Sequence, residues 1–186
     1  LFGTHNLAIL NHYSINEEYE PGNDELYLNM GGKYFKNVSN FLKCNPGYGF
    51  GAVFTDVDND NDLDIYLIND FGENNEPNQI LINQYPKLDF ENKSKELKLN
   101  VGLKSMGVGV GDYNNDSYLD YHVTNIFAGP FMVNRGKDES FVNLAPNIGT
   151  GINKIEGYKD SKQVIIGWGS LFVDYDNDKD LSLIHI

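Results

Sequence analysis

Short apolar runs alternate with polar, turn-forming stretches along the whole chain. The runs at 52–55 (AVFT) and 65–68 (IYLI) are rich in β-branched and aromatic residues, and Asp, Asn and Gly bound them. Such runs are typical of β-strands joined by turns. No stretch has the periodicity of an amphipathic helix of any length. The pattern therefore predicts an all-β protein.

The apolar runs recur as a repeated unit. Residues 50–56 (FGAVFTD) return as 106–112 (MGVGVGD) and again as 168–174 (WGSLFVD). After the first acidic loop, 63–69 (LDIYLIN) matches 119–125 (LDYHVTN). Each unit therefore predicts two strands around one acidic loop.

A second half of the unit repeats as well. The runs 26–29, 80–83 and 131–134 are each followed, six or seven residues on, by a phenylalanine. These segments predict a third and a fourth strand, and the segment 5–11 aligns with the strand after an acidic loop. Five aromatic residues occupy equivalent repeat positions and are expected in the core: Phe35, Phe50, Phe90, Phe141 and Trp168.

Four-stranded units at this spacing predict the blades of a β-propeller, here a fragment of about three blades. The predicted units are 1–48 (the last three strands of a blade), 49–104, 105–166 and 167–186 (the truncated start of a further blade). A chain with such open edges is expected to be marginally stable or to aggregate on its own.

Each acidic loop places oxygen-bearing side chains on alternate positions. They are Asp56, Asp58, Asp60, Asp62 and Asp64 in the first loop, Asp112, Asn114, Asp116 and Asp120 in the second, and Asp174, Asp176 and Asp178 in the third. Carboxylates this close repel one another unless a cation lies among them. Calcium takes about six to eight oxygen ligands, which a short loop can supply. The sequence therefore predicts calcium sites, with Asp62 contributing its backbone carbonyl.

Loop positions are numbered from the first aspartate of each loop, Asp56, Asp112 or Asp174. The loops have two other possible interpretations. An EF-hand needs a glutamate at position 12, where Leu67 and Val123 stand, so an EF-hand is excluded. Asp and Asn are also good turn formers, but three loops in register favour metal binding. Position 6 usually requires a positive φ, which Asn61 tolerates better than Ser117 or Lys179. The first loop is therefore expected to bind best.

Composition and the remaining motifs argue against several classes of function. The chain has 14 basic and 27 acidic residues and a net charge of -13, which argues against nucleic acid or an anionic membrane as partner. No apolar run reaches the length of a membrane span. The four histidines lack zinc-type spacing, and no nucleophile motif occurs, so the chain is predicted not to be an enzyme. His122 is expected to be a packed strand residue.

Three glycines, Gly107, Gly109 and Gly111, could be mistaken for a phosphate-binding motif. A dinucleotide fingerprint needs a helix after the glycines, whereas here Asp112 opens an acidic loop that repels phosphate. The glycines are instead predicted to allow close packing between neighbouring strands and blades.

The motifs that flank the acidic loops resemble the FG-GAP, or VCBS-type, repeat of integrin α-subunit propellers. Four of them are also similar to bacterial secreted proteins of the ASPIC/UnbV group, relatives of cartilage acidic protein: 49–51 (GFG), 64–66 (DIY), 69–71 (NDF) and 106–107 (MG). The resemblance implies an exported calcium-binding propeller, extracellular, at the cell surface or periplasmic. The sequence departs from the family pattern because no loop has glycine at position 6.

The function expected from this resemblance is that of a binding or scaffolding module. A protein or glycan ligand would bind through the propeller loops, which carry specificity in such folds. Two alternatives stay open: the non-catalytic propeller portion of a secreted enzyme, and a cell-surface adhesin.

The last six residues, LSLIHI at 181–186, carry a separate expectation. They can be encoded by CTGTCTCTTATACACATC, which resembles a transposon end sequence attached to DNA during library preparation. The segment is therefore expected to be adapter-derived, with a native aspartate where Ser182 stands. The alternative is that Ser182 is a genuine, weaker ligand followed by a native strand. Together with the non-Met first residue, Leu1, this ending predicts a fragment of a longer protein.

Overall fold

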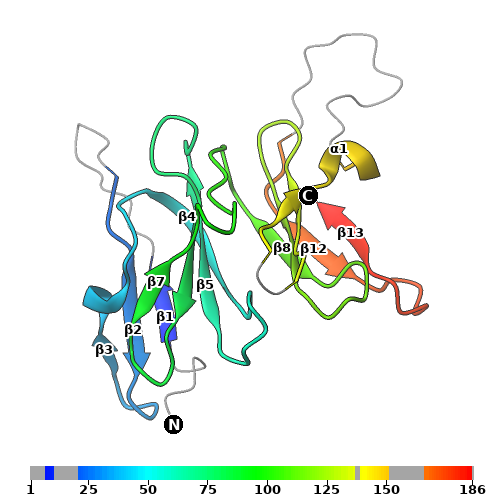
Figure 1. Cartoon of the computed structure of the whole chain (residues 1–186). Coiled ribbons are helices and arrows are strands. Elements are labelled where there is room, and N and C mark those ends of the chain that lie inside the picture. Colours follow the sequence, from blue (N-terminus) through cyan, green and yellow to red (C-terminus); the bar gives the residue numbers. More distant parts are fainter. Residues whose placement is uncertain (1–6, 11–20, 137–138, 151–165, 186) are drawn as a thin grey trace.

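The structure is a computed structural model that describes residues 7–10, 21–136, 139–150 and 166–185. In this part of the chain, antiparallel strands form sheets that follow one another in chain order (Figure 1). The first sheet contains β1 (Leu7–Leu10), β2 (Glu25–Asn29) and β3 (Phe35–Asn37). The second contains β4 (Tyr48–Thr55), β5 (Asp64–Asp70), β6 (Gln79–Asn83) and β7 (Phe90–Asn92).

The third sheet repeats the second, and a two-stranded sheet follows it. The third sheet contains β8 (Val108–Gly111), β9 (Asp120–Val123), β10 (Phe131–Val133) and β11 (Val142–Asn143). The last contains β12 (Ser170–Val173) and β13 (Ser182–His185). Consecutive strands pair throughout, so each sheet is a simple meander. The helices described are one turn each: the 3-10 helix Ser39–Phe41 and α1 (Ala145–Ile148). The prediction of an all-β protein is confirmed.

The middle strands of the second and third sheets are buried on both faces. All residues of β6 are buried, and so are all residues of β5 except Asp70. A strand that faced water on one side would instead alternate buried and exposed residues. The second sheet is therefore covered on both faces.

Three apolar clusters lie between consecutive sheets and account for this burial. Between the first and second sheets the cluster contains Leu26, Leu28, Val38, Leu42, Ile65, Leu67, Leu81 and Phe90. Between the second and third it includes Tyr66, Ile68, Ile80, Tyr121, Val123 and Phe141. Between the third and last it contains Phe131, Val133, Ala145 and Phe172. Each sheet thus packs face to face on the next, and the core is divided among the interfaces.

Gly107, which precedes β8, and the glycines of β8 lie against β12 and the residues just before it. A Cβ atom at Gly107 would come within 2.6 Å of the Trp168 carbonyl oxygen, and one at Gly109 within 2.5 Å of Ser170 Oγ. Real Cβ atoms do not approach other heavy atoms this closely, so only glycine allows the two strands to lie at this separation. The predicted role of these glycines in strand packing is confirmed.

The prediction of a buried aromatic set is correct for two of its five members. Phe90 and Phe141 are buried, but Phe35, Phe50 and Trp168 are exposed by 58%, 37% and 59%. Phe90 and Phe141 each lie in the cluster shared with the preceding sheet. Phe35 belongs to the first sheet, and no described sheet precedes it.

Phe50 and Trp168 are exposed although they contact each other. Phe50 lies near the start of β4 and Trp168 lies just before β12, and their tilted rings have centroids 6.0 Å apart. Two sheets that are separated by a third therefore approach each other at these strand ends. His122 is buried, as predicted, and its Nδ1 lies 2.9 Å from Ser170 Oγ.

Candidate metal centre

The first acidic loop joins β4 to β5, and its own carboxylates fold it. Asp56 Oδ1 and Oδ2 accept hydrogen bonds from the backbone N–H groups of Asp60 and Asn61, both at 3.1 Å. Asp60 Oδ1 accepts the N–H of Asp62 at 2.9 Å. Aspartate side chains commonly close turns in this way. The alternation of Asp in the sequence therefore specifies the shape of the loop as well as its charge.

Asp64, at position 9, anchors the loop to the sheet. Its side chain is fully buried, and it accepts the Val57 N–H at Oδ2 and the Asn83 N–H at Oδ1, both at 2.9 Å. Val57 lies in the loop and Asn83 ends β6. One carboxylate thus ties the loop to two strands of the second sheet.

Three carboxylates of this loop converge. Asp56, Asp58 and Asp64 each offer an oxygen atom, and the three atoms lie within 4.8 Å of one another. Within the described chain, Asp62 Oδ1 is also buried and has no hydrogen-bond partner. Hard cations such as calcium prefer oxygen ligands of this kind. The donor set therefore fits calcium.

The pKa values of these carboxyls show the cost of holding them together without a cation. Burial is the main cause that raises the pKa of Asp64 to about 8 and that of Asp62 to about 6. The pKa of Asp58 is raised by burial and then by the charges of Asp60 and Asp56. A bound cation would favour the ionised forms and offset these shifts.

The second loop repeats the same hydrogen bonds. Asp112 accepts the N–H groups of Asp116 and Ser117 at 3.0 and 2.8 Å, and Asp116 accepts the N–H of Tyr118 at 2.9 Å. Asn114 occupies position 3 and donates its amide to Asp116 Oδ2 at 2.8 Å.

The position-9 residue of the second loop, Asp120, is fully buried like Asp64. It accepts the N–H groups of Tyr113 and Asn134 at 3.1 and 2.9 Å. Burial is the main cause that raises its pKa to about 6. The second loop therefore has the same anchor as the first, but with an amide in place of one carboxylate.

The third loop forms only the part of this arrangement that lies before position 9. Asp174 accepts the N–H groups of Asp178 and Lys179, and Asp178 accepts that of Asp180. The carboxylates of Asp174, Asp176 and Asp178 offer oxygen atoms within 4.8 Å of one another. Ser182 stands at position 9 and begins β13, so the third loop has no aspartate anchor.

All three loops contain two residues with positive φ. At position 6, Asn61, Ser117 and Lys179 have φ of 69°, 72° and 79°, which confirms the requirement predicted for this position. At position 4, Asn59, Asn115 and Asn177 have φ of 64°, 57° and 60°. The sequence analysis missed position 4, although asparagine in all three loops is the signal for it, since Asn adopts this conformation more readily than most residues.

Sequence reasoning also missed the contacts between loops. Asn59 Nδ2 donates to the Ser117 carbonyl at 3.0 Å, and Asn115 Nδ2 donates to Asp180 Oδ1 at 3.1 Å. Asn134 Nδ2 donates to the Val57 carbonyl at 3.0 Å. These bonds cross between neighbouring sheets, so a pattern confined to one repeat could not indicate them.

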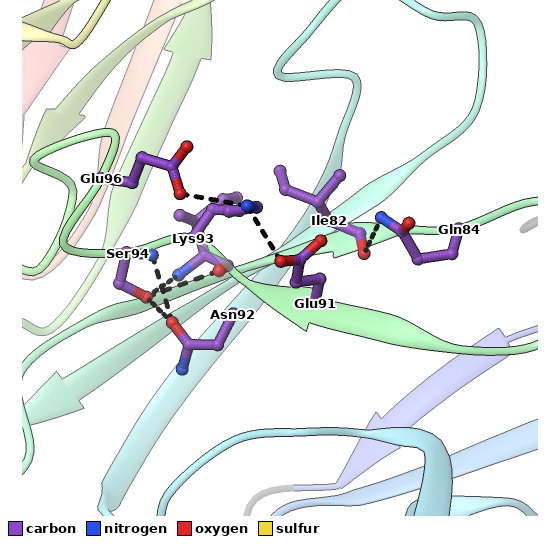
Figure 2. Close-up of polar contacts among 8 residues, drawn as sticks. Ile82, Gln84, Glu91, Asn92, Lys93, Ser94 and Glu96 are labelled. Atoms are coloured by element: carbon purple, nitrogen blue, oxygen red, sulfur yellow. Dashed lines mark hydrogen bonds and ion pairs between the residues drawn. The ribbon is translucent and has the colours of Figure 1, made fainter.

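A groove of about 690 Å³ lies between the second and third sheets, beside the first loop. Its lining includes Asp58, Asp60, Lys93, Leu97, Tyr118 and Phe141. Figure 2 shows the segment that follows β7, where Lys93 Nζ lies 2.9 Å from a carboxylate oxygen of Glu91 and 3.1 Å from one of Glu96. These two carboxylates raise the pKa of Lys93. The groove is therefore lined by both apolar and charged side chains.

Comparison with known proteins adds no family to these observations. No protein-family model and no curated protein matches the chain. Within the described residues, no helix is long and apolar enough to cross a membrane.

Proposed function

We propose that this chain is part of a calcium-binding β-propeller of the FG-GAP, or VCBS-type, class. The observation that carries the proposal is the convergence of Asp56, Asp58 and Asp64 in the first loop, with Asp64 buried and doubly hydrogen-bonded. The second loop repeats the hydrogen bonds, and the third repeats those before position 9. A turn does not need three convergent carboxylates, whereas a calcium site uses several carboxylate oxygens as ligands.

The packing of the sheets supports the propeller part of the proposal. Antiparallel meanders lie face to face in chain order, which is how propeller blades share their cores. The first strands of the third and last sheets, β8 and β12, lie close together, and Phe50 contacts Trp168 across an intervening sheet. Convergence of the first strands is expected around a propeller axis.

We further propose that the propeller is an exported binding or scaffolding module that needs calcium for its stability rather than for chemistry. The groove beside the first loop offers a surface for a protein or glycan ligand. Extracellular modules bind calcium with Kd on the order of 10⁻⁴ to 10⁻³ M, which suits calcium concentrations outside cells.

Site-resolved calcium titration tests this proposal. The backbone amides of Asn61 and Asp62 report the first loop, and those of Ser117 and Tyr118 report the second, because each donates to a loop carboxylate. Saturable shifts of both pairs with calcium, and weaker ones with magnesium, are expected. Absence of any response at millimolar calcium would overturn the proposal.

A further inference from the structure

Two hydrogen-bonded links join the first loop to the second. In the first link, Asn59 Nδ2 donates to the Ser117 carbonyl at 3.0 Å. The peptide unit of Ser117 and Tyr118 also supplies the Tyr118 N–H that Asp116 accepts. Asn59, at position 4 of one loop, therefore fixes the orientation of a peptide plane inside the next loop.

The second link is buried and connects the two position-9 aspartates. Asn134 donates its backbone N–H to Asp120 Oδ1 at 2.9 Å and its side-chain Nδ2 to the Val57 carbonyl at 3.0 Å. The Val57 N–H in turn bonds to Asp64 Oδ2 at 2.9 Å. Asn134 and Val57 are each only 3% exposed. A continuous path of hydrogen bonds thus runs from Asp120 to Asp64.

We propose that these two links couple metal binding at the first and second loops, so that an ion in the first loop raises the affinity of the second. This inference rests on the proposed calcium binding. Asn59 and Asn134 act as positioning residues, since neither supplies a carboxylate to an ion. Asn115 makes a corresponding contact from the second loop to Asp180 of the third.

The coupling is expected to be positive because an ion in the first loop orders part of the second loop. An ion at Asp56, Asp58 and Asp64 holds the first loop in one conformation, and through Asn59 and Asn134 it holds the Ser117 peptide and Asp120 in place as well. The second ion then binds a loop that is already partly ordered, so its binding loses less conformational entropy.

Charge acts in the opposite direction but more weakly. The five aspartates of the first loop keep a net negative charge after one divalent ion binds. Salt also screens interactions between exposed charges beyond about 8 Å at physiological ionic strength. Ordering is therefore expected to outweigh repulsion between the ions.

A thermodynamic cycle measures the coupling directly. Asp58→Asn weakens the first site, and the calcium affinity of the second is read from the amide resonances of Ser117 and Tyr118. In the parent protein we expect Asp58→Asn to lower the second-loop affinity by about fivefold or more, the lower end of typical allosteric coupling. In the Asn59→Gly background, which keeps the Asn134 link, we expect the same change to act by clearly less than in the parent, and by less than about twofold, as for independent sites, when Asn134→Ala is added.

Glycine is the suitable replacement because it accepts the φ of 64° at position 59 while removing the amide. Asn61→Gly is the matched control, since Asn61 has φ of 69° and its N–H bonds within its own loop. Asn61→Gly should leave the coupling intact. Any purely electrostatic effect of Asp58→Asn persists in both backgrounds and cancels in the cycle.

Asn134→Ala tests the buried link, with Asn83→Ala as its control because Asn83 Nδ2 bonds to the Leu63 carbonyl in its own sheet. Should Asn134→Ala fail to fold, the exposed Asn59→Gly variant still decides the question.

An equal effect of Asp58→Asn with and without Asn59→Gly would overturn the coupling, and so would no effect in a parent whose second loop binds calcium. Both results would leave the proposed function standing. No calcium response at either loop would remove the proposed function and the coupling together.

Discussion

The first and third acidic loops have the same turn but different anchors. In both, the position-1 aspartate accepts two backbone N–H groups, and the residues at loop positions 4 and 6 have positive φ. At position 9 the first loop has Asp64, which is buried and bonded to two N–H groups, whereas the third has Ser182. Both residues pair with the last residue of the preceding strand, Thr55 and Val173.

This difference separates two features of a metal-binding loop: the turn itself and the anchor that ties it to the sheet. The turn is specified locally, because alternate aspartates close it whether or not position 9 is acidic. The anchor needs a third strand as well, since Asp64 bonds to Asn83 at the end of β6, and the last described sheet has two strands. The shape of the loop therefore depends on about nine consecutive residues. A complete metal site depends on the rest of the sheet as well.

The largest effect is expected at the anchor. Asp64→Ala leaves the buried N–H groups of Val57 and Asn83 without their acceptor, at about 1–3 kcal/mol each. We predict that it lowers the free energy of unfolding by about 3 kcal/mol in denaturant melts without calcium, and that it abolishes binding at the first loop. Asp64→Asn keeps one acceptor, so its free energy of unfolding should lie between those of the parent and Asp64→Ala. An Asp64→Ala protein as stable as the parent would contradict the anchoring role.

A second prediction compares equivalent glycines in neighbouring sheets. Gly107→Ala places a Cβ 2.6 Å from the Trp168 carbonyl oxygen, so β8 and β12 must separate. We expect a loss of about 1–3 kcal/mol in the free energy of unfolding. Gly51→Ala, at the same repeat position, meets nothing within 4 Å and is the control. Equal losses for the two variants would show that β8 and β12 do not pack as described.

Calcium affinity should rise with pH in both loops, and the rise should continue to a higher pH in the first loop than in the second. Burial raises the pKa of Asp64 to about 8 and that of Asp120 to about 6. Each folded-state pKa exceeds the unfolded value, so without metal these groups make the protein less stable as pH rises through about 4 to 8 and 4 to 6. Calcium requires the ionised forms and so displaces protons across these windows. Titrations at pH 5.5 and 7.5 in buffers of different ionisation enthalpy would detect the released protons; pH-independent affinity at both loops would contradict the assignment.

The smallest effect should come from completing the third loop. Ser182→Asp places a carboxylate at the register position that Asp64 occupies in the second sheet. One restored hydrogen bond contributes about 1 kcal/mol, and the added charge should raise the calcium affinity of this loop. Ser182→Asn is the control for size. Unchanged affinity for Ser182→Asp would show that the third strand, and not the side chain, limits the third site.

The repeat pattern predicted which segments form strands and loops, because each repeat contains its own apolar runs and turn residues. It also predicted the positive φ at position 6. It failed for Phe35, which is exposed: the equivalent Phe90 and Phe141 are buried against the sheet before their own, so their burial depends on a neighbouring sheet and not on the repeat itself. Asn59 and Asn134 were missed for a related reason: their partners, Ser117 and Val57, lie in neighbouring units, and spacing within one unit carries no information on contacts between units.

A thermal melt of the purified protein with calcium and with a chelator would show whether calcium stabilises the fold. With Kd on the order of 10⁻⁴ to 10⁻³ M, about 10 mM calcium should stabilise the fold by about 1.4 to 2.7 kcal/mol per bound site. We expect the melting temperature to rise with calcium, to fall with the chelator, and to respond less in Asp58→Ala than in Asp62→Ala, because the proposed ligand at position 62 is a backbone carbonyl. A melting temperature that is the same with calcium and with the chelator would contradict this expectation.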